Sequence, residues 1–139
     1  MFKNILVPTD FSIKSKRGLE IAINIALLDH GNIYVLHVIK TMPNSTFEEF
    51  EDFYQKLEKQ AEKQMTELLA SYKGAQINME WAVVYGNRVQ EILRFAEDHQ
   101  IDLIVMNSHK IDPETPVQGW GTISYKVGVL ANCPIMLVK

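Results

Sequence analysis

Residues 3–10 read KNILVPTD, and this stretch decides how the rest of the chain is interpreted. Ile5 to Pro8 is a short, continuous apolar run that follows two polar residues, which is typical of a strand buried on both faces of a sheet. Either Asp10 or Ser12 can then cap a helix, because both side chains accept hydrogen bonds from free backbone N–H groups. A buried strand followed at once by a helix favours an α/β fold.

The same alternation of strands and helices continues along the sequence. Further buried strands are predicted at residues 33–39, 102–106 and 135–138, with a more exposed or edge strand around 77–83. Helices are predicted from the cap to about residue 30, where Gly31-Asn32 stops the first one, and then at 46–72, 89–96 and 121–131. Residues 40–45 and 107–118 are interpreted as loops. This pattern predicts one doubly wound α/β domain over residues 1–139, a five-stranded parallel sheet with helices on both faces.

Composition narrows the class of protein. The chain has 139 residues, of which 47% are hydrophobic, which suits one globular domain. A net charge of −3 gives no electrostatic case for nucleic acid or a membrane surface, so we expect neither partner. Cys133 is the single cysteine, which excludes an internal disulfide and fits a reducing compartment. Without a signal-peptide core or a long apolar span, we expect a soluble, cytoplasmic protein.

Two segments follow the carboxyl ends of predicted strands, where open parallel sheets bind ligands. One is residues 8–12, and the other is residues 107–110, which lead to Gly121 and Thr122 at a helix start. Asp10 can cap a helix or satisfy a turn, the commoner role, or it can accept a hydrogen bond from a ribose hydroxyl. Gly121 and Thr122 can be a plain helix start, with Thr122 as the cap, or a place for phosphate.

Other chemically suggestive residues have ordinary interpretations. His109 lies in a loop without metal-ligand spacing around it, so we expect no zinc site. His37 lies within an apolar strand and is interpreted as a hydrogen-bonded core residue, although its backbone and that of Val38, at the strand end, can still meet a ligand. Trp120 either packs under the loop or covers a ligand. Because no base–nucleophile pair is visible, we expect no catalysis beyond slow ATP hydrolysis.

Taken in order, several segments resemble the universal stress protein family across essentially the whole chain. They are residues 3–10, 36–39, Gly86, 102–109, 121–124 with Lys126 and Val127, and 133–138. The resemblance implies a flavodoxin-like domain with strand order 3-2-1-4-5. It also implies a homodimer that pairs through the last strand, Ile135 to Val138, and an apolar strand at an edge does need cover.

The glycine motif of nucleotide-binding family members is only partly present. That motif is Gly-x-x-Gly, nine residues, then Gly and Ser or Thr. Here Asn107 and Lys110 occupy the two leading glycine positions, and ten residues separate Lys110 from Gly121. Asn tolerates a left-handed backbone, whereas Lys is a poorer substitute whose ammonium can still attract phosphate. The intervening loop also carries two carboxylates and two prolines, so nucleotide binding is expected to be weakened, altered or absent.

The resemblance implies a set of ligand contacts and leaves one alternative. Adenosine contacts would involve Pro8, Thr9, Asp10 and the backbone of Val38. Phosphate contacts would involve Ser108, His109, Gly121, Thr122 and Ile123, with Asn107 and Lys110 at the substituted positions. The ligand would be AMP or ATP, accompanied by Mg²⁺ if it is ATP. The alternative is a dimeric interaction module that has lost nucleotide binding and contacts an unknown protein partner.

Overall fold

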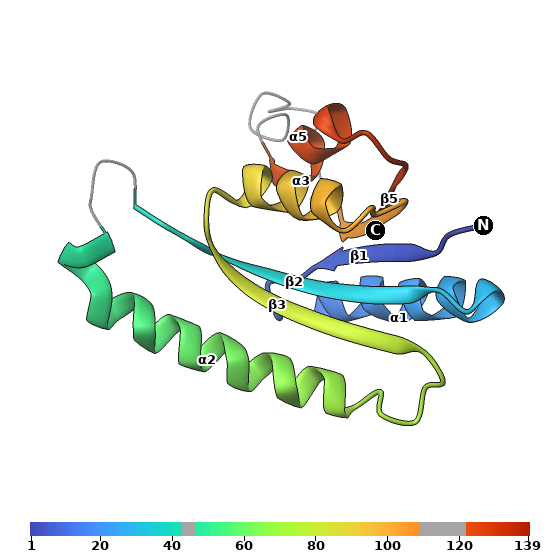
Figure 1. Cartoon of the computed structure of the whole chain (residues 1–139), viewed down its shortest axis with the longest axis horizontal. Helices are drawn as coiled ribbons and strands as arrows, with labels where there is room; N and C mark the ends of the chain where they lie inside the picture. The colour runs from blue at the N-terminus through green and yellow to red at the C-terminus, as the bar shows by residue number, and fades with distance from the viewer. Residues whose placement is uncertain (43–46, 109–121) are drawn as a thin grey trace.

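Five parallel strands form one sheet in the computed structural model, which describes residues 1–42, 47–108 and 122–139 (Figure 1). The strands are β1 (Asn4–Pro8), β2 (Asn32–Lys40), β3 (Asn78–Gly86), β4 (Leu103–Asn107) and β5 (Ile135–Val138). Their spatial order is β3-β2-β1-β4-β5, and every neighbouring pair runs parallel. The predicted fold class and strand order are therefore confirmed, and β3 lies at an edge as its alternating sequence indicated.

Helices cover both faces of this sheet. They are α1 (Ile13–Asp29), α2 (Glu51–Ala70), which is preceded by the 3-10 turn η1 (Phe47–Phe50), α3 (Arg88–Asp98) and α5 (Ile123–Leu130). Figure 1 shows α1 and α2 on one side of the strands and α3 and α5 on the other. None of the helices in the described part of the chain combines the length and apolar character that a membrane crossing requires.

The central strand β1 is apolar at every core position because both of its faces are covered. Ile5 and Val7 pack in the cluster that includes α1 and α2, whereas Leu6 packs in the cluster with α3 and α5. Each of these three side chains is at most 1% exposed. Successive side chains of a strand point to opposite faces, so a strand between two helical layers has no polar side.

The long amphipathic helix differs from its prediction at the N-terminal end. Its buried stripe consists of Tyr54, Ala61, Met65 and Leu68, as the helical spacing predicted. Instead of one α-helix from residue 46, however, a 3-10 turn precedes α2. The N-cap position is Phe50, whose side chain makes no capping hydrogen bond. Without a side-chain acceptor for the first N–H groups, this end begins in the tighter helix form.

The first helix stops at the predicted place for a different reason. His30, not Gly31, takes the left-handed conformation at the C-cap, with φ at 52°. Gly31 is required by space, because a Cβ there would lie 2.8 Å from the carbonyl oxygen of Phe2. The glycine therefore lets the chain turn closely past the residues that precede β1.

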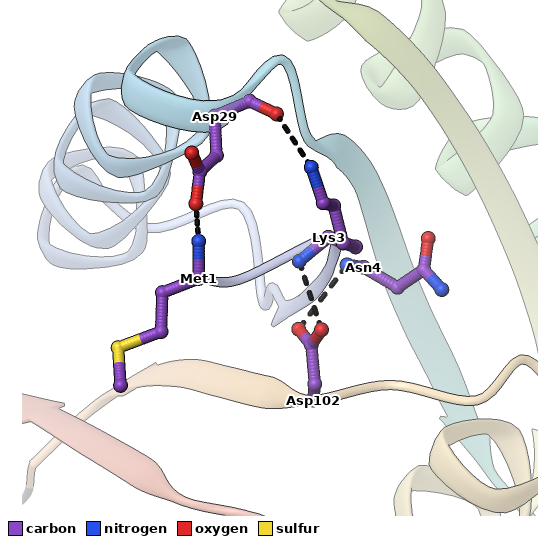
Figure 2. Close-up of polar contacts among 5 residues, drawn as sticks. All are labelled: Met1, Lys3, Asn4, Asp29 and Asp102. Carbon is purple, nitrogen blue, oxygen red and sulfur yellow. Dashed lines mark hydrogen bonds and ion pairs between the residues drawn. The ribbon is translucent and has the colours of Figure 1, made fainter.

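A row of polar side chains fixes where the strands begin. The Asp102 carboxylate accepts hydrogen bonds from the backbone N–H groups of Lys3 (2.8 Å) and Asn4 (3.1 Å), as Figure 2 shows. The side chain of Asn32 donates to that of Asn4 (3.0 Å), and Asn78 donates to Asn32 (3.2 Å). These contacts link the starts of β1, β2 and β3 to the residue before β4. They help to fix the register of the strands, and so the relative positions of the strands' carboxyl ends.

Candidate functional site

A cavity of about 220 Å³ lies at the carboxyl ends of β1 and β4. The chain runs from β1 through β2 to β3 on one side and places β4 and β5 on the other, so the strand order reverses here. The cavity is lined by Pro8, Thr9, Asp10, Ser12, Lys14, Ser15, Leu36, His37, Val38, Arg88, Ile92, Met106, Asn107, Ser108, Ile123 and Ser124. Apolar walls with a few converging polar groups are the usual make-up of a small-molecule site.

Most of the predicted contact residues that the structure describes come together in this cavity. Those lining it are Pro8, Thr9, Asp10, Val38, Asn107, Ser108 and Ile123. Thr122 is not among the lining residues. It caps α5 instead, with Oγ1 accepting a hydrogen bond from the backbone N–H of Tyr125 (3.3 Å). His109, Lys110 and Gly121, together with Trp120, lie outside the described residues.

Hydroxyl groups brace the turn between β1 and α1. Thr9 Oγ1 accepts a hydrogen bond from the N–H of Phe11 (3.0 Å), and Ser15 Oγ donates to the carbonyl of Ser12 (2.8 Å). Thr9 Oγ1 and Ser15 Oγ lie 3.0 Å apart. Because the single hydroxyl proton of Ser15 goes to Ser12, Thr9 is the donor in that contact. The floor of the cavity is therefore a satisfied network that a ligand does not need to disrupt.

Phe11 holds an unusual backbone conformation next to the cavity. Its φ is 65°, a left-handed value that bulky residues rarely adopt. The ring is held 4.6 Å from the His37 ring, centroid to centroid. Strain of this kind persists only where surrounding contacts determine the conformation, and it concentrates at ligand sites. Here it turns the chain sharply enough to leave Asp10 at the mouth of the cavity.

Asp10 is a charged hydrogen-bond acceptor at the cavity mouth. Its Oδ1 accepts the backbone N–H of Ser12 (2.9 Å), whereas Ser12 itself caps α1 by accepting from Ser15 N–H. Burial raises the pKa of Asp10, but hydrogen bonding by Ser12 outweighs this and leaves that pKa below its ordinary value. A carboxylate has about four acceptor positions, so the turn leaves capacity for a ligand hydroxyl.

His37 joins β2 to the turn after β1. Its Nδ1 lies 2.8 Å from the carbonyl oxygen of Thr9. A carbonyl can only accept, so Nδ1 carries a proton and donates it to Thr9. The predicted hydrogen-bonded role is confirmed. The ring is also half-buried and lines the cavity, which an apolar strand sequence did not reveal.

Sequence reasoning missed the two cations of the cavity, Lys14 and Arg88. Both are exposed helix residues, and such residues usually form a solvated face. The signal that finds them is position, because each lies in the first turn of a helix that follows the carboxyl end of a strand. Since α1, α3 and α5 all contribute first-turn residues to the cavity, their N-terminal partial charges add to its positive potential.

The end of β4 and the residue after it form another part of the cavity lining. Ser108 N–H donates to the carbonyl of Val138 (2.9 Å), and Lys139 Nζ donates to Ser108 Oγ (3.0 Å). A Cβ built on Gly18 of α1 would lie 3.2 Å from Asn107 Oδ1. The lack of a side chain at residue 18 therefore lets the helix approach the carboxyl end of β4 closely.

Metal and thiol chemistry find little support among residues 1–42, 47–108 and 122–139. No group of three or more His, Cys, Asp or Glu side chains that could hold a metal ion occurs there. Burial and the nearby Asp102 raise the pKa of the Cys133 thiol, which disfavours the reactive thiolate.

Comparisons with known proteins point to one family. The model of the universal stress protein family matches residues 1–139. Universal stress protein YxiE of Bacillus subtilis is 28% identical over 149 residues, covering all of both proteins. A universal stress protein of Methanocaldococcus jannaschii is 27% identical, over all of this chain and 96% of its relative.

Solved structures agree. The structure of that M. jannaschii protein has a TM-score of 0.84 at 28% identity, over 100% of this chain and 96% of the other. Universal stress protein UspA of Lactobacillus plantarum has a TM-score of 0.75 at 26% identity, over 99% and 98%. Two structures at 17% identity share the fold, with TM-scores of 0.75 and 0.69. One is a complex with cAMP, and the other, from Archaeoglobus fulgidus, is a complex with dAMP.

Proposed function

Because the chain belongs to the universal stress protein family, we propose that it binds an adenine nucleotide, AMP or ATP, in the cavity between β1 and β4. One observation carries the proposal. Seven residues predicted from sequence to contact the nucleotide line a single cavity, although they come from the ends of β1, β2 and β4 and from the start of α5. The site lies where the strand order reverses, which is where open parallel sheets bind such ligands.

Different lining residues suit different parts of a nucleotide. Val38, Ile92 and Met106 provide apolar surface for a base, and the Asp10 carboxylate can accept hydrogen bonds from ribose hydroxyls. Ser124 lines the cavity from the first turn of α5, where helix N–H groups favour negative charge. The cAMP and dAMP complexes of distant relatives support adenosine monophosphate as the ligand class. ATP would enter with the Mg²⁺ that its phosphates coordinate.

Calorimetric titration with adenosine, AMP and ATP tests this function. We expect AMP to bind with a Kd between about 10 µM and 1 mM, weaker than tight nucleotide sites because Asn107 occupies a glycine position. Asp10→Ala should weaken both adenosine and AMP, whereas the matched control Asp52→Ala, on the exposed side of α2, should not. Absence of heat with all three ligands at about 1 mM would contradict the proposal.

A second proposal concerns assembly: the chain forms a homodimer through β5. Apolar side chains gather on α5 and β5, where Val129 is 64% exposed, Leu130 58%, Leu137 41% and Met136 37%. Among the described strands, β5 pairs with β4 alone, so its outer edge is available to the same strand of a second copy. If the chain forms a dimer but binds no nucleotide, the result would favour the alternative function, a dimeric interaction module that has lost nucleotide binding.

Sedimentation velocity separates these possibilities. The wild-type chain should sediment as a dimer, and Leu137→Glu should shift it to the monomer because the charge would be buried in the interface. Leu28→Glu is the matched control, since Leu28 on α1 is 82% exposed and belongs to neither α5 nor β5. A wild-type monomer at about 0.1 mM, near the weak limit of stable association, would overturn the dimer.

A further inference from the structure

We propose that Lys14 and Arg88 hold the anionic end of the ligand and so supply the charge contacts that the incomplete glycine motif cannot. The inference rests on the proposed function, because it concerns the same cavity. It also narrows the class of ligand. The ligand would be a nucleotide whose phosphate charge is neutralised by two protein side chains and not by a divalent cation.

The two cations reach the cavity from opposite layers of the molecule. Lys14 lies in the first turn of α1, two residues after the N-cap Ser12. Arg88 is the first residue of α3 and directly follows the N-cap Asn87. Figure 1 shows α1 and α3 on opposite faces of the sheet, and both residues line the cavity at the carboxyl ends of the strands. A ligand bound in this cavity would therefore meet a cation from each helical layer.

Neither cation has a salt-bridge partner among the described residues. The salt bridges within the described ranges join Met1 to Asp29 and Arg94 to Glu91, so neither involves Lys14 or Arg88. Asp10 is the one carboxylate among the described lining residues. Two cations against one carboxylate give the described part of the cavity lining a positive balance in a chain whose net charge is −3. That potential attracts anions and favours their entry.

The chemistry of the two side chains fits a phosphate group. The guanidinium of Arg88 stays charged and presents a planar set of donors that matches two phosphate oxygens. The ammonium of Lys14 is a mobile point charge on a flexible stem, so it can follow phosphates of different length. A glycine loop binds phosphate mainly through backbone N–H groups, and Asn107 carries a side chain where such a loop needs close backbone approach.

The test compares AMP with adenosine, because only AMP carries the charge. Calorimetric Kd values are measured in EDTA for the wild type, Lys14→Gln, Arg88→Gln and the double variant. Each single variant should weaken AMP about three- to tenfold, the double variant more, and adenosine binding should not change. Lys16→Gln and Arg94→Gln are matched controls, since they remove the same charges from α1 and α3 outside the cavity.

Each outcome decides something. Full AMP affinity in both single variants and the double variant would overturn the inference and leave the proposed function standing. If the wild type bound neither AMP nor adenosine, the proposed function would fail and the inference with it. Parallel loss of adenosine and AMP binding in the variants, or AMP binding that requires Mg²⁺, would also contradict the charge role. Melting temperatures equal to that of the wild type show that the variants are folded.

Discussion

The Nδ1 atom of His37 lies 2.8 Å from the carbonyl oxygen of Thr9, so a ring on β2 holds the turn that follows β1. The ring also contacts Phe11, whose left-handed backbone shapes the same turn. A half-buried side chain of the central sheet thus links the strand core to the residue that precedes Asp10. The geometry of the candidate site therefore depends on a contact made by the fold itself.

Replacing His37 with Phe should destabilise the protein by about 1–2 kcal/mol, because the Thr9 carbonyl loses a partly buried donor while the ring contact is kept. Urea unfolding measures the change. His99→Phe is the matched control, since the Nδ1 of His99 also bonds a carbonyl, that of Phe95, but in an exposed place where water can replace it. Equal destabilisation of the two variants would argue against a special role for His37.

Gly31→Ala should cost about 1–3 kcal/mol, because the added Cβ would meet the Phe2 carbonyl at 2.8 Å and backbone must move. Gly74→Ala offers the opposite case, since nothing lies within 4 Å of its Cβ position. There we expect no loss, or a small gain from a less flexible unfolded chain. Thermal melting of both variants is the measurement. A tolerated alanine at residue 31 would show that the turn before β2 is looser than the structure has it.

Asp102→Ala should lower stability by about 1–3 kcal/mol, because the Lys3 and Asn4 N–H groups lose a charged acceptor. Asp98→Ala, at the exposed end of α3, controls for loss of a negative charge. Hydrogen exchange should show faster exchange at Lys3 and Asn4 in the Asp102 variant than in the wild type. Unchanged exchange there would mean that the carboxylate does not fix the start of β1.

Tyr85 should make stability fall in alkaline solution. Burial and the hydrogen bond to Glu58 raise the pKa of Tyr85 from 10.0 to about 12. A raised pKa favours the neutral phenol in the folded state, so its contribution is complete below pH 10.0 and is lost as the pH rises towards 12. Tyr85→Phe should therefore be less stable than the wild type near neutral pH. Between pH 10.0 and about 12, its stability should depend less on pH than that of the wild type. Urea midpoints at several alkaline pH values check both expectations, and identical slopes would contradict them.

Much of the fold could be predicted because its signals are local. The continuous apolar run at Ile5 to Pro8 reflects a strand that is buried on both faces. The apolar stripe from Tyr54 to Leu68 reflects a helix that is buried on one face. The end of α1 shows the limit. Gly31 marked the right place, but whether His30 or Gly31 takes positive φ depends on how the chain passes Phe2, which is a tertiary matter.

The site was less predictable, because a cavity is defined by neighbours distant in sequence. Asp10 and Val38 were found through their place at strand ends, whereas His37, Lys14 and Arg88 were not assigned to it. An apolar strand concealed His37, and exposed helix positions concealed the two cations. Thr122 was placed at the right helix start, but its hydroxyl caps the helix instead of lining the cavity.

An NMR titration of the ¹⁵N-labelled chain with AMP tests the central claim most directly, because it reports where the ligand lies as well as whether it binds. We predict that the amide signals of Thr9, Val38 and Ser124, which line the cavity from β1, β2 and α5, move together along one saturable curve. Signals of the exposed face of α2 should stay in place. Perturbation confined to other surfaces, or no movement at about 1 mM AMP, would contradict the account.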